Sequence, residues 1–202
     1  MIDEARGAGD GAPVVERVVE RVVDRAGDLA ARCSRLIRDV PDYPAPGVMF
    51  KDITPLLADG PTFAAVVEHL AQVARVAGGI DLVAGMEARG FIIGAPVATT
   101  LGIGFLPVRK AGKLPGPTLA QSYDLEYGTA TVEVHPATIP AGARVLVIDD
   151  VLATGGTAGA TVELIERAGG VVVGLAFLLE LAFLNGRTHL PARSVTSLLT
   201  VA

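Results

Sequence analysis

The first regular pattern in the chain is helical. Between residues 15 and 36, apolar side chains recur at alternating steps of four and three, with charged side chains between them. This period matches one face of an α-helix, so the segment is predicted to be an amphipathic helix. Its apolar face either packs on its own domain or contacts a second subunit, and the sequence leaves both interpretations open.

A second helical pattern runs from Phe63 to Ala77 and ends at Gly78-Gly79, which is typical of a helix C-terminus. The Pro-rich segment 40–47 lies between the two helical patterns. Each proline fixes its own φ angle and restricts the residue before it. We therefore expect an extended, stiff connection there, followed by a loop that presents residues 48–52.

Buried strands and helices alternate in the rest of the chain. The predicted strands are residues 81–85, 103–108, 129–135, 144–150, 171–179 and 194–201, of which 129–135 is expected to be exposed and antiparallel. The predicted helices are residues 91–101 and 158–168. This alternation predicts an α/β fold with a mostly parallel twisted sheet flanked by helices, and a ligand site at the carboxyl ends of the strands.

Length and charge narrow the interpretation. A chain of 202 residues suits a single domain, residues 1–202. The formal net charge of −5 argues against nucleic acid or a membrane surface as a partner, so any phosphate binding must be local. Residues 1–11 are acidic and Gly-rich rather than a targeting sequence, and no stretch has the length of an apolar membrane span, so we expect a cytoplasmic protein.

Cysteine chemistry contributes little. Cys33 is the single cysteine of the sequence, which excludes an intrachain disulfide and a zinc site built from thiolates. We interpret it as a buried or idle thiol rather than a reactive one.

The chemistry is concentrated after the strand 144–150. Asp149 and Asp150 end this strand, and the segment 151–157, with glycines at 155 and 156, leads into the next helix. Glycines let the backbone turn tightly, and successive N–H groups at a helix N-terminus can hold a phosphate. The two carboxylates can accept hydrogen bonds from ribose hydroxyls or hold Mg²⁺ through water. Separately, the glycines also fit an ordinary turn, and the aspartates a helix cap.

Residues 145–157 together resemble the diphosphoribosyl-binding motif of type I phosphoribosyltransferases. Further segments are similar, in order and approximate spacing, to the adenine phosphoribosyltransferase family: Pro41–Pro55, Glu87–Phe91, Val108–Pro115 and Tyr123–Gly128. The resemblance runs from Leu36 to near the carboxyl end, and residues 1–20 look like an extension. It implies the type I phosphoribosyltransferase fold with a small N-terminal hood at residues 36–57.

This resemblance implies that the 5-phosphoribosyl group of 5-phosphoribosyl-1-diphosphate (PRPP) is transferred to adenine, giving AMP and pyrophosphate, with Mg²⁺ as cofactor. It also implies a homodimer. One alternative is a phosphoribosyltransferase for another 6-substituted purine. Another is a non-catalytic regulator that senses PRPP and binds DNA, but such proteins usually need a helix-turn-helix domain, for which the helix at 14–38 is a poor substitute.

The resemblance assigns roles on the sugar and pyrophosphate sides of the site. Asp149 and Asp150 would bind the ribose hydroxyls and, indirectly, the metal. The 5′-phosphate would be held by Ala153, Thr154, Gly155, Gly156 and Thr157. The pyrophosphate loop would consist of Glu87, Ala88 and Arg89, with a non-proline cis peptide expected between Glu87 and Ala88. Positive charge would reach the departing pyrophosphate from Arg109, Lys110 and Lys113.

On the base side, the resemblance implies that Phe50 stacks on adenine and that the backbone of Met49 and Lys51 reads its edge. Leu181 would cover the other face. Taken alone, Phe50 also fits core packing, Arg89 a surface ion pair, and the loop at 109–117 a mobile, solvated surface.

Two further roles concern proton movement and closure. Glu126 would contact adenine and ease proton transfer as the ring becomes the N9-substituted product, although a surface strand position also fits. Tyr127 would align a lid built from residues 109–127, which excludes water from the sugar cation. The catalytic residues implied are therefore Glu126, Arg89, Asp149 and Asp150.

Overall fold

The computed structural model describes residues 27–125, 128–190 and 192–202. Its strands are β1 (Arg38–Val40), β2 (Phe50–Asp52), β3 (Leu82–Met86), β4 (Gly104–Lys110), β5 (Leu119–Leu125), β6 (Gly128–Val134), β7 (Arg144–Leu152), β8 (Val171–Leu181) and β9 (Val195–Val201). Its helices are residues 27–36, α2 (Thr54–Ala58), α3 (Gly60–Ala77), α4 (Arg89–Leu101) and α5 (Gly156–Arg167). Short 3₁₀ turns are η1 (Pro136–Thr138), η2 (Ala182–Leu184) and η3 (Gly186–His189).

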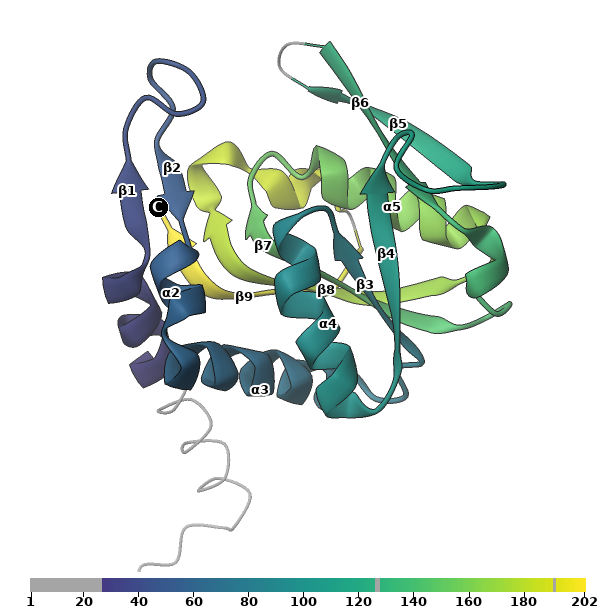
Figure 1. Ribbon diagram of the computed structural model, residues 1–202, viewed down its shortest axis with the longest axis horizontal. Coiled ribbons are helices and arrows are strands. Elements are labelled where there is room, and N and C mark those ends of the chain that lie inside the picture. The colour runs from purple at the N-terminus through teal and green to yellow at the C-terminus, as the bar shows by residue number, and fades with distance from the viewer. Residues whose placement is uncertain (1–26, 126–127, 191) are drawn as a thin grey trace, which may run out of the picture.

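A twisted sheet forms the centre of the molecule (Figure 1). Within the described residues it has seven strands in the order β5-β6-β4-β3-β7-β8-β9. The five neighbouring strands β4, β3, β7, β8 and β9 are parallel, whereas β6 pairs antiparallel with both β4 and β5. The predicted α/β fold with a mostly parallel sheet is therefore confirmed.

Alternate residues of the central strands point to opposite faces of the sheet, and helices cover both faces. On one face, Ala84, Val145 and Val147 pack in a core with the apolar side chains of α5. On the other face, Val83, Leu146 and Ile148 pack with residues 27–36, α2, α3 and α4. Burial on both faces explains why these strands are continuous apolar runs in the sequence.

The described part of the first helix ends where it was predicted to end. Residues 27–36 are helical, and Leu29 and Cys33 are buried in the core next to α3. Burial raises the pKa of the Cys33 thiol to about 11, as expected for an idle thiol. Residues 15–26 of the predicted helix lie outside the described residues.

Two regions of the chain differ from the predictions, the hood and the segment around β5. Residues 48–52 were expected to be a loop, but β2 pairs antiparallel with β1, and ion pairs join Lys51 to Asp39 (2.6 Å) and Arg38 to Asp52 (3.4 Å). This hairpin and α2 form the small N-terminal hood. Likewise β5 was not predicted, and β4 continues to Lys110 into the segment expected to be a loop. In both cases the strand is defined by its partner and not by a local apolar period.

No helix in the described part of the chain has the length and the apolar character that crossing a bilayer requires.

Replacing Phe177 by alanine tests the core. This ring is 0% exposed in the middle of β8. Removing it should lower the free energy of unfolding by about 3–5 kcal/mol, because a large apolar side chain is lost and a cavity is left. Phe183→Ala is a matched control, since Phe183 is 58% exposed, and should change stability by about 0.5 kcal/mol or less. Urea unfolding of both variants measures the difference, and equal losses would contradict this account of the core.

Candidate active site

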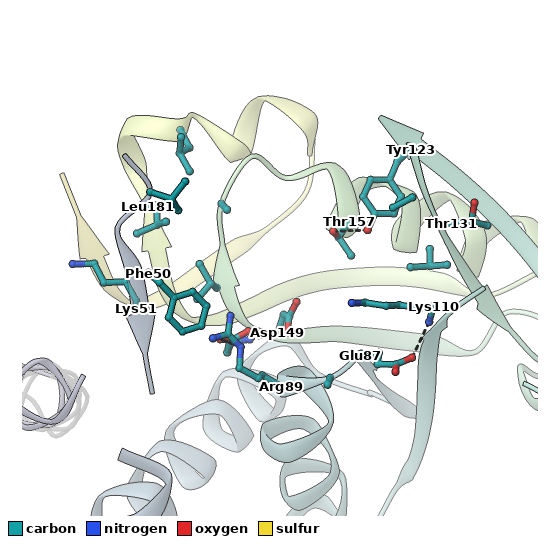
Figure 2. A pocket seen from close by; sticks show the side chains of 18 of the residues that line it. Phe50, Lys51, Glu87, Arg89, Lys110, Tyr123, Thr131, Asp149, Thr157 and Leu181 are labelled. Carbon is teal, nitrogen blue, oxygen red and sulfur yellow. Dashed lines mark hydrogen bonds and ion pairs between the residues drawn. The ribbon is translucent and has the colours of Figure 1, made fainter. Parts of the chain in front are cut away.

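A cavity of about 730 Å³ lies where the carboxyl ends of β3, β7 and β8 meet the hood hairpin and the strands β4, β5 and β6. This is the edge of the sheet at which the alternation of strands and helices placed a site. Many residues named from the sequence line it: Met49, Phe50, Lys51, Glu87, Ala88, Arg89, Lys110, Asp149, Asp150, Ala153, Thr157 and Leu181. Figure 2 shows Phe50, Arg89, Lys110, Asp149 and Thr157, whose side chains come to the cavity from separate segments of the chain.

Other predicted residues lie elsewhere. A small adjoining hollow of about 70 Å³ is lined by Thr154, Gly155 and Gly156 together with the ends of the same loop. Neither Arg109 nor Lys113 is among the residues lining the larger cavity. Glu126 and Tyr127 lie outside the described residues.

Sequence reasoning missed part of the lining: Val48, Ala111, Tyr123, Ala130, Thr131, Val132, Val151 and Leu184. Tyr123 lies on β5, which was not predicted, whereas Ala130, Thr131 and Val132 lie on β6, a predicted strand that was not expected to face the site. Tyr123 is the most informative of them. It opens a segment already singled out by resemblance, and this was the available signal.

The loop after β7 has the geometry of an anion cradle. Gly155 has a φ of +86°, a left-handed conformation that favours glycine, and α5 begins at the next residue. The first N–H groups of an α-helix have no partners within the helix, and the helix dipole makes this end positive. The Thr157 hydroxyl lies in the same turn and donates to the Tyr123 hydroxyl at 3.0 Å. The loop can therefore hold a phosphate, with two hydroxyl groups beside it.

The paired acids at the end of β7 are held away from water. Asp150 is 3% exposed, and its backbone N–H donates to Asp149 Oδ1 at 2.9 Å. Burial raises the pKa of both carboxyls, and the charge of Asp150 raises the pKa of Asp149 further, whereas Arg89 acts to lower both. A positive charge brought to this site would be stabilised, because it would relieve the two carboxylates.

Arg89 connects the acids to the aromatic side of the cavity. Its Nε lies 2.8 Å from Asp150 Oδ2, although this buried oxygen has no partner in hydrogen-bond geometry. The guanidinium carbon lies 4.8 Å from the centre of the Phe50 ring, whose edge-to-face partner is Tyr43 at 5.1 Å. The cation therefore lies between the ring and the carboxylates (Figure 2).

Glu87 joins the loop after β3 to the end of β4 on another side of the cavity. Its Oε2 accepts hydrogen bonds from the backbone N–H of Lys110 (2.9 Å) and from Arg109 Nε (3.1 Å), and these hydrogen bonds lower the pKa of Glu87. The Arg109 side chain is thereby held against Glu87 and 6.0 Å from the ring centre of Phe91. The peptide bond between Glu87 and Ala88 is cis, as expected.

Comparison with known proteins agrees with this geometry. Residues 56–194 match the family described as phosphoribosyl transferase domain. An adenine phosphoribosyltransferase from Thermobifida fusca is 59% identical over 174 residues, which are 86% of this chain and 98% of the relative. One from Streptomyces coelicolor is 66% identical over 154 residues, 76% of this chain and 84% of the relative. This chain belongs to the adenine phosphoribosyltransferase family.

The structure also has the fold of solved adenine phosphoribosyltransferases over most of its length. A crystal structure of the enzyme from Rhodothermus marinus superimposes with a TM-score of 0.82 at 50% identity, covering 87% of this chain and 99% of that one. The expected type I phosphoribosyltransferase fold is thus confirmed, and the chain is a member of a transferase family.

Gly90→Ala tests the packing of α4 against the acids. A Cβ at Gly90 would lie 2.8 Å from Asp149 Oδ1 and 2.9 Å from the Ile148 carbonyl, so the acid or the helix must shift. We expect transfer activity to fall about 10- to 100-fold, because small displacements of reacting groups are costly. Gly60→Ala, where a Cβ meets nothing within 4 Å, is the matched control. Equal activity of the two variants would contradict this role of Gly90.

Asp149→Asn tests the electrostatics. Because the pKa of Asp149 is raised on folding, this carboxyl is more protonated in the folded protein than in the unfolded chain above about pH 4, and its contribution to stability falls as pH rises through that window. The variant should therefore gain stability over the wild type at pH 7 but not at pH 3.5, and lose activity roughly 100-fold. Urea unfolding at both pH values measures this. A stability difference independent of pH would refute it.

Proposed function

We propose that this enzyme transfers the 5-phosphoribosyl group of PRPP to adenine, giving AMP and pyrophosphate. The supporting observation is one cavity lined by the aromatic platform at Phe50, by the paired acids of β7, and by Ala153 and Thr157, which flank the glycine turn at the start of α5. Relatives that are 59% and 66% identical to this chain are named adenine phosphoribosyltransferase.

The paired acids suit the sugar. Breaking the bond between ribose C1 and pyrophosphate builds positive charge on the ring. Asp149 and Asp150 would accept hydrogen bonds from the ribose hydroxyls and favour this cation, in a site where burial strengthens the interaction. The loop from Ala153 to Thr157 would hold the 5′-phosphate, which fixes the sugar over the acids. Adenine then attacks C1 from the face opposite the leaving group, with inversion.

The pyrophosphate side needs positive charge. Arg89 and Lys110 line the cavity, and the Lys110 side chain reaches into it (Figure 2). With Glu87 and Ala88 they would bind the leaving group. Arg109 and Lys113 would join them only by turning toward the cavity, and Arg109 would have to release Glu87 to do so.

The residues present fit a magnesium ion that arrives with the substrate. Mg²⁺ prefers oxygen ligands and commonly binds through one or two carboxylates together with substrate phosphates. Asp149 and Asp150 offer carboxylate oxygens, and Asp150 Oδ2 has no hydrogen bond. No larger cluster of metal-ligating side chains occurs among the described residues, so phosphate and water would complete the shell. The ion would neutralise charge on the pyrophosphate.

The base site would use the hood. Phe50 would stack on adenine, and the backbone of Met49 and Lys51 would read its edge. The Lys51 amino group points away from the ring to its ion pair with Asp39, which is consistent with a backbone role (Figure 2). Leu181 lines the cavity and would cover the other face of the base.

Glu126 and Tyr127 remain proposals from resemblance: Glu126 would assist proton transfer at adenine, and Tyr127 would align the lid. With Glu126→Gln, turnover should fall while the KM for PRPP stays similar, because the carboxylate acts on the base and not on the sugar. Steady-state kinetics with each substrate varied measures this, and unchanged turnover would refute the proton role. We also propose a homodimer, on the same resemblance, and a location in the cytoplasm, on the character of residues 1–11.

The decisive experiment supplies PRPP, Mg²⁺ and one purine at a time, and separates the products. AMP from adenine, with little IMP from hypoxanthine or GMP from guanine, is expected. Comparable IMP or GMP would favour another purine as substrate. Absence of every nucleotide, together with DNA binding in a gel shift, would favour a regulator. The Asp149→Asn, Asp150→Asn double variant serves as the negative control.

Phe50→Ala tests the base platform. Stacking of a base on an aromatic ring contributes about 1–3 kcal/mol, so the KM for adenine should rise roughly 5- to 150-fold. The KM for PRPP should change much less, because Phe50 lies on the hood and not on the phosphate loop. Steady-state kinetics with each substrate varied in turn gives both constants, and a parallel rise would contradict the stacking role.

A further inference from the structure

The loop that holds the proposed phosphate site rests on a second loop, residues 182–190, which follows β8. The two loops meet backbone to backbone through glycines. A Cβ on Gly155 would overlap the carbonyl oxygen of Gly186, and a Cβ on Gly186 would overlap the carbonyl oxygen of Ala153. At the next turn of α5, a Cβ on Gly159 would approach the His189 carbonyl at 3.3 Å. The position of Gly186 therefore limits how far the phosphate loop can move toward it.

Arg187, next to Gly186, fixes this second loop to the sheet. Its Nε and Nη2 each donate to a different oxygen of Glu180, both at 2.6 Å, and its Nη1 donates to the Val195 carbonyl at 2.9 Å. Ser197 also donates to Glu180, at 2.9 Å. A two-pronged arginine–carboxylate pair fixes orientation as well as distance, which a lysine cannot reproduce.

Both charges of the pair are maintained. Glu180 is 6% exposed at the end of β8, and its hydrogen bonds with Arg187 lower its pKa, while the same pairing raises the pKa of Arg187. Neither residue is among those lining the cavity. The pair can act on the phosphate loop through Gly186 and through His189, which lies against Gly155 and Gly159.

We propose that Arg187, held by Glu180, is a positioning residue that sets the place of the phosphate loop and so the affinity for the sugar 5′-phosphate. This inference rests on the proposed function. The base site also has anchors outside this loop, because Phe50 lies on the hood hairpin and Leu181 is paired with Val201 in the sheet. Loss of the pair should thus weaken phosphate binding without a matching loss at adenine.

The test uses Arg187→Lys and Gly186→Ala. Gly186 does not have a positive φ, so alanine there challenges only the packing on Leu152 and Ala153. Arg193→Lys is the matched control, since Arg193 pairs with Glu166 at 2.9 Å. For each protein, calorimetry gives the Kd of ribose 5-phosphate, kinetics gives the KM of PRPP and of adenine, and thermal unfolding gives the Tm.

We expect Arg187→Lys and Gly186→Ala to weaken ribose 5-phosphate binding and raise the KM of PRPP about 10- to 100-fold, with the KM of adenine within about twofold of the control. The pair would be merely structural, and the inference overturned, if the Tm falls while both phosphate measurements stay within about twofold of Arg193→Lys. A parallel loss at adenine and PRPP would also overturn it. A wild-type protein that makes no AMP would instead reject the proposed function, before any variant is compared.

Discussion

Two neighbouring carboxylates at the end of β7 must be kept out of water, and much of the site is arranged around this constraint. Burial raises the pKa of both, which means that their charged forms are disfavoured in the folded protein. Arg89 acts to lower both pKa values, with its Nε 2.8 Å from Asp150 Oδ2. Arg89 is the first residue of α4, and the helix places it beside the acids. The close approach of α4 at Gly90 requires the absence of a side chain. The acids are thus held ready for a cation, at a cost to stability.

The same arrangement couples the two ends of the cavity. Arg89 contacts Asp150 and the face of Phe50, so the group expected to bind pyrophosphate also occupies space beside the base platform. Substrate phosphates would offer Arg89 a stronger partner than a phenyl ring. Its departure would leave the ring free to stack and the acids free for the sugar. Oriented charges of this kind need little rearrangement when the bond breaks.

The sequence was informative where local physics decides the structure. Four buried aliphatics before Asp149 mark a central strand, and the glycines at 155 and 156 mark the turn that follows. It was uninformative where a distant partner decides. The strands of the hood have three residues each and exist because they pair with each other. The contact between Arg109 and Glu87 joins residues 22 apart in the chain. The pair of Glu180 with Arg187 is related to the phosphate loop only by the packing of Gly186 and His189 against that loop.

The hairpin of β5 and β6 joins the sheet through a short register with β4 and packs on α5, where Val132 and Val134 are buried. Its register with β4 covers only Arg109 with Glu133 and Lys110 with Val132 within the described residues, whereas β7 and β8 pair along most of their length. On the other side it meets the phosphate loop through the hydrogen bond of Tyr123 with Thr157. A phosphate bound at Thr157 would compete for that hydroxyl, so occupancy of the sugar site would reach the hairpin directly.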